Sequence, residues 1–367
     1  MTDAASTPAP DDRPILVTGS CGLVGTAVLH ELGARGLPAV AAARGKKSDR
    51  KLLAALGRRY PVAPVPAWAD LTDRDAVRAM IAQHRPRAVI HLAAVIPPAA
   101  YASPGAARRV NVDATHHLLD ACRAVPETPR FLLASSVTVY GPRNPHTHPD
   151  PVTVDTPPAP SDLYGAHKLE AEAAVRDSGL DASILRVGGV LSPAGDYGVD
   201  ADVIAFEGML PGDGRIHTVA VADVARAFVN AALRPDNDPV YLIGGDATHL
   251  IRQRDIGRAI TAALSIPGTM PPTRPGDPGD DAAWYGTDWM DTARSQQLLQ
   301  FQTVSFDELM AQVSAHVGWP RHLLRPLVPA IRLFMNRMTP YRRRSGVYAQ
   351  PWEFAQERWE QPLPDRR

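Results

Sequence analysis

Cysteine is nearly absent from this 367-residue chain, which has only Cys21 and Cys122. Cys21 lies in a glycine-rich turn and Cys122 in a predicted helix, so we expect no structural disulfide and a reducing, cytoplasmic location. No apolar run reaches the roughly 18 residues of a membrane-spanning helix, so no such helix is predicted. Neither sign of charge is in excess, since Lys and Arg total 39 and Asp and Glu total 39. Nucleic acid is therefore not predicted as a partner.

Signal-peptide and metal-site patterns are also missing. Residues 1–13 are rich in Ala, Ser, Thr, Pro and Asp, without a basic start followed by an apolar core. We therefore predict a disordered leader there, and not a secretory signal. In the proline-rich stretch 142–160, His146 and His148 have no third ligand at a suitable spacing, so no metal site is predicted.

A glycine-rich turn lies close to the start of the chain. A short apolar run typical of a buried strand ends at Thr18, and Gly19, Gly22 and Gly25 follow it. Helical periodicity begins at Leu23, so the pattern is strand, tight turn, helix. Gly19 suits the turn, Gly22 lets the backbone approach a pyrophosphate, and Gly25 lets the helix pack closely on the strand. Because the N-terminus of such a helix favours phosphate, the turn predicts a dinucleotide site.

The end of the second predicted strand, Leu37 to Ala43, indicates which dinucleotide is preferred. NAD sites usually have an acidic residue here, whose carboxylate accepts hydrogen bonds from ribose hydroxyls. In this chain Ala43 takes that place and Arg44 follows it. A guanidinium pairs well with a 2′-phosphate, so we expect NADP(H) to be favoured over NAD(H). The alternative is that Arg44, Lys46 and Lys47 form a solvated loop that is indifferent to the phosphate.

Strand-like and helical segments alternate along most of the chain, and a long helix expected at about 104–125 carries Asn111 in its interior. The alternation predicts an α/β fold with a doubly wound (Rossmann) parallel sheet. We expect a dinucleotide-binding domain over 14–187, completed by about 216–246. The segments 188–215 and 247–318 follow strand ends, where ligands bind in such folds. They are expected to form a smaller C-terminal substrate lobe.

The final segment, 319–367, is predicted to be a C-terminal amphipathic tail. Between Leu323 and Met335, apolar residues are interrupted by arginines. Such a segment can dock on the rest of the chain, pair with another subunit, or contact a membrane surface. Docking or a subunit contact is the favoured expectation.

A tyrosine and a lysine lie one turn apart on another predicted helix. We expect this helix to run from 162 to about 177, with Ser161 as its N-cap. Tyr164 and Lys168 are four residues apart, so they lie on one face. An ammonium group one helical turn from a phenol, together with the positive charge of an oxidised nicotinamide, would favour the phenolate.

Seven short motifs follow one another along the chain on the expected elements. They are Thr18-Gly19-Ser20-Cys21-Gly22-Leu23-Val24-Gly25, Asp70-Leu71, His91-Leu92-Ala93-Ala94, Asn111-Val112, Ser135-Ser136-Val137-Thr138-Val139-Tyr140-Gly141, Tyr164-Gly165-Ala166-His167-Lys168 and His217-Thr218-Val219-Ala220-Val221-Ala222-Asp223-Val224-Ala225. In this order they make the chain, from residue 14 to about 317, resemble the extended short-chain dehydrogenase/reductase family of the NAD-dependent epimerase/dehydratase type.

The resemblance implies roles for individual residues. Tyr164 would donate or accept the proton, with Lys168 as its partner. Ser136 would hold the substrate oxygen, and Asn111 would support this catalytic group. Asp70 would contact the adenine region, and Lys168 would also bind the nicotinamide ribose. The residues expected at the cofactor are Gly19, Cys21, Gly22, Leu23, Val24, Gly25, Arg44, Asp70, Leu71, Ala93, Ala94 and Lys168.

Departures from the family pattern bear on the reaction. Dehydratases of this type carry an Asp-Glu pair where this chain has Val137-Thr138, so dehydration is disfavoured. Nucleotide-sugar epimerases usually place an Asn two residues after the arginine that ends the sixth strand, and here Gly188 takes that place after Arg186. We therefore expect an oxidoreductase that moves hydride between a nicotinamide cofactor and a secondary alcohol or ketone.

Two alternatives stay open. One is a nucleotide-sugar epimerase that uses tightly held NAD. The other is a non-catalytic, cofactor-sensing protein that kept the fold. By resemblance alone, we also expect a homodimer formed through the helices that carry Asn111 and Tyr164, with a small molecule as substrate.

Overall fold

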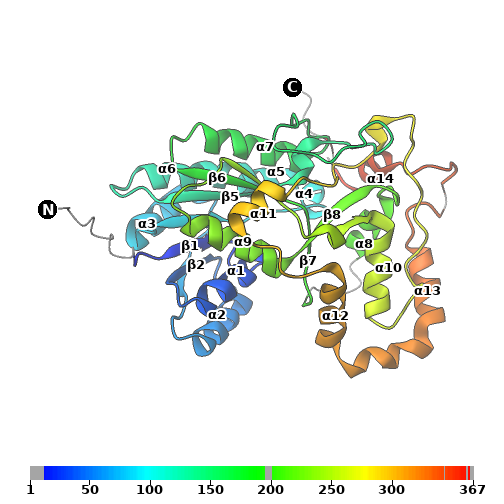
Figure 1. The fold of residues 1–367 in the computed structure, drawn as a ribbon, viewed down its shortest axis with the longest axis horizontal. Helices are drawn as coiled ribbons and strands as arrows, with labels where there is room; N and C mark the ends of the chain where they lie inside the picture. The colour runs from blue at the N-terminus through cyan, green and yellow to red at the C-terminus, as the bar shows by residue number, and fades with distance from the viewer. Residues whose placement is uncertain (1–11, 195–200, 343, 361–362, 364–367) are drawn as a thin grey trace.

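The computed structural model describes residues 12–194, 201–342, 344–360 and 363, so most of the predicted leader lies outside the described residues. Its centre is a seven-stranded parallel sheet with the order β3-β2-β1-β4-β5-β6-β9 (Figure 1). The strands are β1 Ile15–Thr18, β2 Ala39–Ala43, β3 Val65–Trp68, β4 Ala88–His91, β5 Arg130–Ser136, β6 Ala182–Val187 and β9 Val240–Ile243. The predicted doubly wound α/β fold is confirmed.

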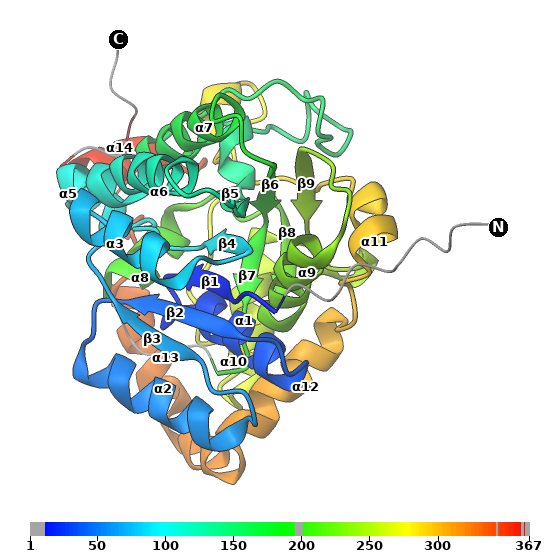
Figure 2. The same ribbon diagram turned by 90° about the vertical axis from the view of Figure 1, so that its left-hand side faces the viewer.

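Helices cover both faces of this sheet, and the alternation of side chains along β1 shows how. Ile15 and Val17 belong to one apolar cluster, whereas Leu16 belongs to the cluster on the opposite face. The first cluster includes residues of α1 Leu23–Ala34, α2 Lys47–Arg59 and α9 Val221–Leu233. The second includes residues of α3 Arg74–His84, α6 Ala114–Arg123 and α7 Leu163–Arg176 (Figure 2). Because both faces are covered, the inner strands are mainly apolar, whereas the edge strand β3 is largely exposed.

The order of strands creates a crevice at one edge of the sheet. The chain moves outward from β1 to β2 and β3, and then crosses over to β4 on the other side of β1. Between β1 and β4 the connecting loops therefore diverge, and a crevice opens beyond the carboxyl ends of these strands. This is the place at which a ligand is expected in such a fold.

A second, mixed sheet of three strands lies beside the large one. It contains β7 Gly189–Leu191, β8 Arg215–Ala220 and β10 Leu250–Arg252, with β8 parallel to β7 and antiparallel to β10. Strand β8 lies in the segment that was expected to complete the large sheet, and it pairs in the small one instead. The helices of this region are α8 Ala201–Met209, α10 Gln253–Ala263, α11 Ala293–Leu299 and α12 Phe306–Val317.

The long helix expected at about 104–125 is interrupted. It is divided into α5 Pro104–Arg108, a π-helical turn η1 Arg109–Asp113, and α6. The π turn contains Asn111, whose side-chain amide bonds to the loop that follows β4, so the local widening accompanies a tertiary contact.

The N-cap of α7 also differs from the expectation. Asp162, and not Ser161, is the capping residue, and its Oδ1 accepts a hydrogen bond from Gly165 N at 2.9 Å. The other carboxylate oxygen of Asp162 accepts from the Tyr101 hydroxyl. One short acidic side chain therefore satisfies the helix end and a tertiary contact together.

The tail forms three helical segments, η5 Trp319–Leu327, α13 Val328–Arg337 and α14 Pro351–Arg358. Arg358 forms an ion pair with Asp202 of α8 at 2.6 Å, and the neighbouring Trp359 ring lies 5.9 Å from that of Tyr101. The end of the tail therefore packs on the lobe of its own chain. The longest described helix, α7, has 14 residues, and no helix in the described ranges is long and apolar enough to cross a membrane.

Candidate active site

A cavity of about 1580 Å³ lies at the carboxyl ends of the large sheet and extends to the small sheet and the tail. Sites for one drug-sized molecule are usually about 300–1,000 Å³, so this cavity has room for a dinucleotide and a second molecule. Every residue predicted to bind cofactor lines it, and so do Tyr164 and Ser136. The glycine turn after β1 and the N-terminal half of α7 lie on the same cavity.

The glycine turn has no room for side chains. Gly19 has a φ of 63°, and a Cβ added there would lie 2.8 Å from Ala93 N. A Cβ at Gly25 would lie 2.2 Å from the carbonyl oxygen of Gly19. Gly22 is the N-cap of α1, and no side chain caps the first amides of the helix. These amides are therefore available to a phosphate, as the dinucleotide prediction requires.

The end of β2 forms the second part of the cavity. Arg44, Lys46 and Ser48 line it with exposed side chains. Across from them, the Asp70 carboxylate accepts hydrogen bonds from Thr72 N at 2.9 Å and Thr72 Oγ1 at 2.8 Å. These bonds, with a smaller contribution from the charge of Arg44, hold the pKa of Asp70 below its usual range. The Asp70 carboxylate is thus fixed by Thr72, and Arg44 lies close enough for its charge to act on it.

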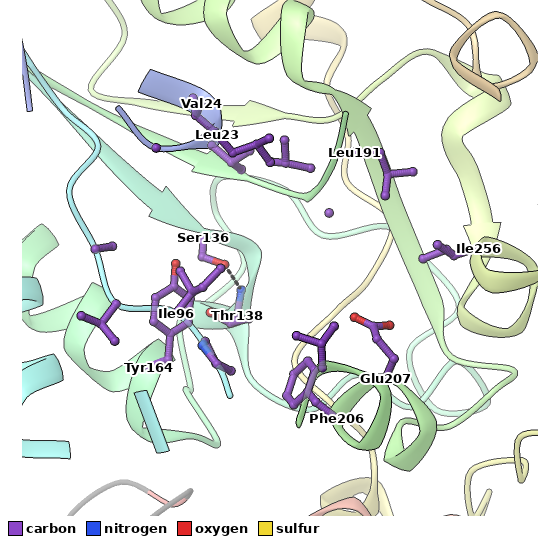
Figure 3. A pocket seen from close by; sticks show the side chains of 18 of the residues that line it. Leu23, Val24, Ile96, Ser136, Thr138, Tyr164, Leu191, Phe206, Glu207 and Ile256 are labelled. Carbon is purple, nitrogen blue, oxygen red and sulfur yellow. Dashed lines mark hydrogen bonds between the residues drawn. The ribbon is translucent and has the colours of Figure 1, made fainter. Parts of the chain in front are cut away.

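The tyrosine and lysine of α7 face the same end of the cavity. Lys168 Nζ lies 5.7 Å from the centre of the Tyr164 ring and donates a hydrogen bond to the Ala134 carbonyl oxygen at 2.7 Å. The hydroxyl of Ser136, at the end of β5, is a hydrogen-bond partner of Tyr164 and accepts from Thr138 N at 3.2 Å (Figure 3). Phenol, ammonium and hydroxyl therefore converge at one point.

Burial controls the protonation of this pair. It lowers the pKa of Lys168 to about 8, and the nearby Glu172 carboxylate opposes that shift. Burial, together with the charge of Asp162, raises the pKa of Tyr164, and the hydrogen bond with Ser136 only partly offsets this. In the protein without cofactor, desolvation of the phenolate therefore outweighs the expected stabilisation by the ammonium, and the effect of an oxidised nicotinamide stays a prediction.

Asn111 is placed differently from the other predicted catalytic residues, since its side chain does not line the cavity. Its Oδ1 accepts from Val95 N at 2.8 Å, and its Nδ2 donates to Val95 O at 2.9 Å. Val95 itself lines the cavity, on the loop after β4. Asn111 thus holds the backbone of that loop.

His91 is a buried residue of β4 and not part of the cavity wall. Its ring nitrogens form hydrogen bonds with the hydroxyls of Thr18 at 2.7 Å and Thr115 at 3.0 Å. Burial lowers the pKa of His91 to about 3, so it is neutral at physiological pH. The residue therefore links β1, β4 and α6 as a neutral hydrogen-bonding group.

Three further residues of this region were missed by sequence reasoning. Tyr101 donates a hydrogen bond to the buried Asp162 carboxylate at 2.5 Å, and its oxygen lies 3.1 Å from that of Tyr285. Burial raises the pKa of Asp162 to about 6. The position of Asp162 immediately before the tyrosine helix was a usable signal. Tyr101 and Tyr285 are separated by 184 residues, and nothing local in the sequence joins them.

Glu207 of α8 was also missed, although it stands alone in the apolar segment 203–210. Its carboxyl faces the cavity opposite Tyr164 and Ser136, beside Phe206 (Figure 3). Gln253 Nε2 donates a hydrogen bond to it at 2.5 Å, and burial raises its pKa. The described residues include no group of three or more His, Cys, Asp or Glu side chains that could hold a metal ion.

A switch-point crevice, a turn whose Gly19 and Gly25 leave no room for a Cβ, and a Tyr–Lys pair on one cavity are features of the Rossmann fold, in which dinucleotides are bound at this place. Residues 15–244 match the NAD dependent epimerase/dehydratase family, and the chain belongs to that family. The predicted family is thereby confirmed, and binding of a nicotinamide cofactor is typical of it.

Relatives and solved structures agree with this assignment. The chain is 33% identical over 178 residues to methionine adenosyltransferase 2 subunit beta of Pongo abelii, covering 48% of this chain and 46% of that protein. It is 32% identical over 192 residues to UDP-glucose 4-epimerase of Azospirillum brasilense, covering 50% and 51%. The chain thus spans about half the length of the curated relatives it matches. The structure of Thermus thermophilus UDP-glucose 4-epimerase with NAD has a TM-score of 0.65 and 23% identity, covering 83% and 98%. This last likeness shows the fold alone.

Proposed function

We propose that the protein is an NAD(P)-dependent oxidoreductase that interconverts a ketone and a secondary alcohol, with Tyr164 as the proton donor or acceptor. The observation that carries the proposal is the placement of Tyr164, Lys168 and Ser136 on the cavity that also contains the glycine turn. Gly19, Gly22 and Gly25 would hold the pyrophosphate of the cofactor, and Lys168 its nicotinamide ribose. A bound nicotinamide would supply or accept the hydride.

The protonation states favour ketone reduction. Tyr164 holds its proton at neutral pH because burial raises its pKa. It can therefore donate that proton to a ketone oxygen held by Ser136 while the carbonyl carbon receives hydride. The ketone would become an alcohol by taking this proton and the hydride that a bound cofactor would supply, and Tyr164 would regain its proton from solvent. Lys168 stabilises the transient negative charge on the tyrosine oxygen.

We propose NADP(H) as the preferred cofactor. Arg44 and Lys46 are exposed cations on the cavity wall next to Ser48, and a 2′-phosphate at this position would receive charge-assisted hydrogen bonds from them. Asp70 would meet the adenine region, as the family resemblance implies. The wall around the substrate end is mainly apolar, with Leu191, Phe206 and Ile256 on it. A medium-sized, largely apolar ketone fits this wall.

The test is NADPH oxidation with a panel of carbonyl compounds. Wild type is expected to oxidise NADPH with at least one apolar ketone. Tyr164→Phe is expected to lose turnover by about a hundredfold or more, because the proton donor is gone. Its cofactor affinity should stay the same, since the phenol oxygen does not hold the dinucleotide. Unchanged turnover in this variant would refute the role of Tyr164.

A second candidate is a nucleotide-sugar epimerase, which the name of the Azospirillum relative favours. Against it, a Cβ at Gly188 would lie 2.2 Å from the carbonyl oxygen of His217, so no side chain at this position can hold a diphosphate. Two measurements on the purified protein distinguish the epimerase from the proposed reductase. An epimerase would retain NAD and be inhibited by UDP, whereas the proposed reductase would do neither.

A third candidate is a cofactor-binding subunit of a larger assembly, which the name "subunit beta" of the Pongo relative favours. Such a subunit would bind NADPH and show no turnover with any ketone in the panel. Tyr164→Phe would then have no measurable consequence.

A further inference from the structure

The start of the tail presents large apolar side chains to solvent. We call this surface the tail face, and it comprises Trp319, Leu323, Leu324, Leu327, Leu333 and Phe334. Trp319 is 70% exposed, Leu323 57% and Phe334 49%. These residues lie on η5 and α13, in the orange segment at the lower edge of the molecule in both views (Figures 1 and 2). An exposed apolar group of this size marks an interaction surface.

The charges of the chain segment that carries the tail face are of one sign. Residues 309–352 contain seven arginines and no Asp or Glu, although the whole chain is neutral. Arg321 and Arg332 are engaged with backbone carbonyl groups of Ser314, Gly318 and Gly268. Arg325 and Arg337 are exposed and have no ion pair within the described part of the chain. The tail face is thus apolar and flanked by unneutralised positive charge.

We propose that the tail face binds the surface of a membrane that contains anionic lipid. Large apolar side chains that alternate with arginines are the composition of interfacial helical segments, in which the former enter the acyl boundary and the latter meet headgroup phosphates. A second copy of the chain is a poor occupant, because a two-fold contact would place arginines against arginines. The protruding position of the segment suits a broad, flat partner.

The same helix connects this surface to the cavity. Ile331 and Met335 of α13 line the cavity wall, whereas Leu333 and Phe334 of α13 are exposed. One helix therefore separates the apolar cavity from the proposed membrane side. A ketone dissolved in the lipid would be concentrated next to the cavity. This extension rests on the proposed function, whereas membrane binding itself does not.

Co-sedimentation of the full-length protein with vesicles tests the proposal. Vesicles of phosphatidylcholine alone are compared with an equal mixture of phosphatidylcholine and phosphatidylglycerol. We expect binding to the mixed vesicles, weak binding to the neutral ones, and loss of binding as salt is raised. Arg325→Gln with Arg337→Gln should weaken binding by roughly fivefold for each charge removed. Leu323→Ser with Leu327→Ser should weaken it by about tenfold or more.

Matched variants control for charge and for apolar exposure in general. Two double variants alter exposed residues elsewhere and should bind vesicles like wild type. The charge control is Arg58→Gln with Arg78→Gln, and the apolar control is Val65→Ser with Val154→Ser. Circular dichroism and melting temperature check that every variant is folded. Absence of binding to mixed vesicles, or equal binding by wild type and the tail-face variants, overturns the proposal. A second result would also overturn the proposal. If wild type were a dimer that does not bind vesicles, and Leu323→Ser with Leu327→Ser were a monomer, the tail face would be assigned to a second copy of the chain. NADPH oxidation is measured separately. Failure of the proposed oxidoreductase function and failure of the proposed membrane binding can therefore be told apart.

Discussion

Glu207 is a carboxyl group on a cavity wall where its neighbours are largely apolar. It has one side-chain partner, Gln253, and burial raises its pKa. A substrate that covers this group must remove water from it, which costs free energy when the carboxylate is ionised. If the proposed ketone covers this group, we expect Glu207 to favour largely apolar substrates that carry a hydroxyl or amine at that point over those that have no donor to offer it.

Glu207→Gln tests this selection. The variant keeps a side chain of the same shape and loses the charge, so KM for an apolar ketone without a donor should fall by about fivefold, or on the order of 1 kcal/mol. The turnover number should stay the same, because Glu207 lies across the cavity from Tyr164. Steady-state kinetics measures both. Glu353→Gln, an exposed residue of the tail, is the control. An unchanged KM in Glu207→Gln would show that the substrate does not cover this group.

Arg44 carries the second prediction at this scale. Arg44→Ala should weaken NADPH binding by about tenfold, since an exposed guanidinium–phosphate pair is partly screened by solvent. NADH binding should change little, because NADH has no 2′-phosphate. Fluorescence titration with each dinucleotide measures this, and Arg58→Ala, an exposed arginine of α2, is the control. Parallel weakening of both dinucleotides would instead assign Arg44 to the adenine or the fold.

Site residues that belong to short local motifs could mostly be predicted from the sequence. The glycine turn and the Tyr164–Lys168 pair are local patterns, and the structure places both on the cavity. Glu207 was not predicted, because its position opposite Ser136 depends on how α8 packs. The direction of the Tyr164 pKa was also not readable, since it depends on burial by segments far away in the chain.

Helix α7 holds Tyr164, the proposed proton donor, and Asp162 caps this helix and contributes to the electrostatics of Tyr164. The Asp162 carboxylate caps the helix and accepts from Tyr101. Its negative charge also contributes to the raised pKa of Tyr164. An uncharged residue that keeps the cap should therefore lower the pKa of Tyr164 without unfolding the helix.

Asp162→Asn is such a change. We expect the limb of the pH profile that reports Tyr164 to move to lower pH in this variant, because the phenolate no longer faces a carboxylate. Asp162→Ala also removes the cap and should cost about 1 kcal/mol or more of stability. Plots of kcat/KM against pH and urea unfolding curves measure the two effects. A profile that is identical in Asp162→Asn and wild type would contradict the assignment of the limb to Tyr164.

At the scale of elements, the alternation of strands and helices predicted the large sheet because most of its strands are buried on both faces and read as short apolar runs. The interruption of the 104–125 helix was not predictable, since the π turn accompanies the bonds between Asn111 and Val95. The placement of β8 was missed for a similar reason. A short apolar strand carries no local sign of which sheet it joins, and the pairing of β8 with β7 and β10 decides it.

The whole molecule joins three parts around one cavity. The large sheet contributes the glycine turn and the Tyr164 site, the small sheet and α8 contribute the apolar wall, and α13 closes the far side with Ile331 and Met335. The domain limits drawn from the sequence stay a prediction, and so does the homodimer. Light scattering on the purified protein measures the oligomeric state directly.

Folding stability of the whole molecule should depend on pH through His91. Burial lowers its pKa to about 3 in the folded protein, against about 6.5 in the unfolded chain. Between these values the unfolded chain binds the proton and the folded protein does not, so stability is fully present above pH 6.5 and is lost as the pH falls. From pH 6.5 to pH 5 this single residue should lower the free energy of unfolding by about 2 kcal/mol. Urea unfolding at both pH values measures the change.

The comparison with His91→Gln isolates this contribution from that of other titrating groups. Gln can form hydrogen bonds toward Thr18 and Thr115 but does not titrate, so the variant should be less stable at neutral pH and should lose less stability on acidification. His116→Gln, an exposed histidine of α6, should behave like wild type at both pH values. If His91→Gln lost as much stability as wild type between pH 6.5 and pH 5, the acid sensitivity would have to come from other groups whose pKa is lowered by folding, such as His217.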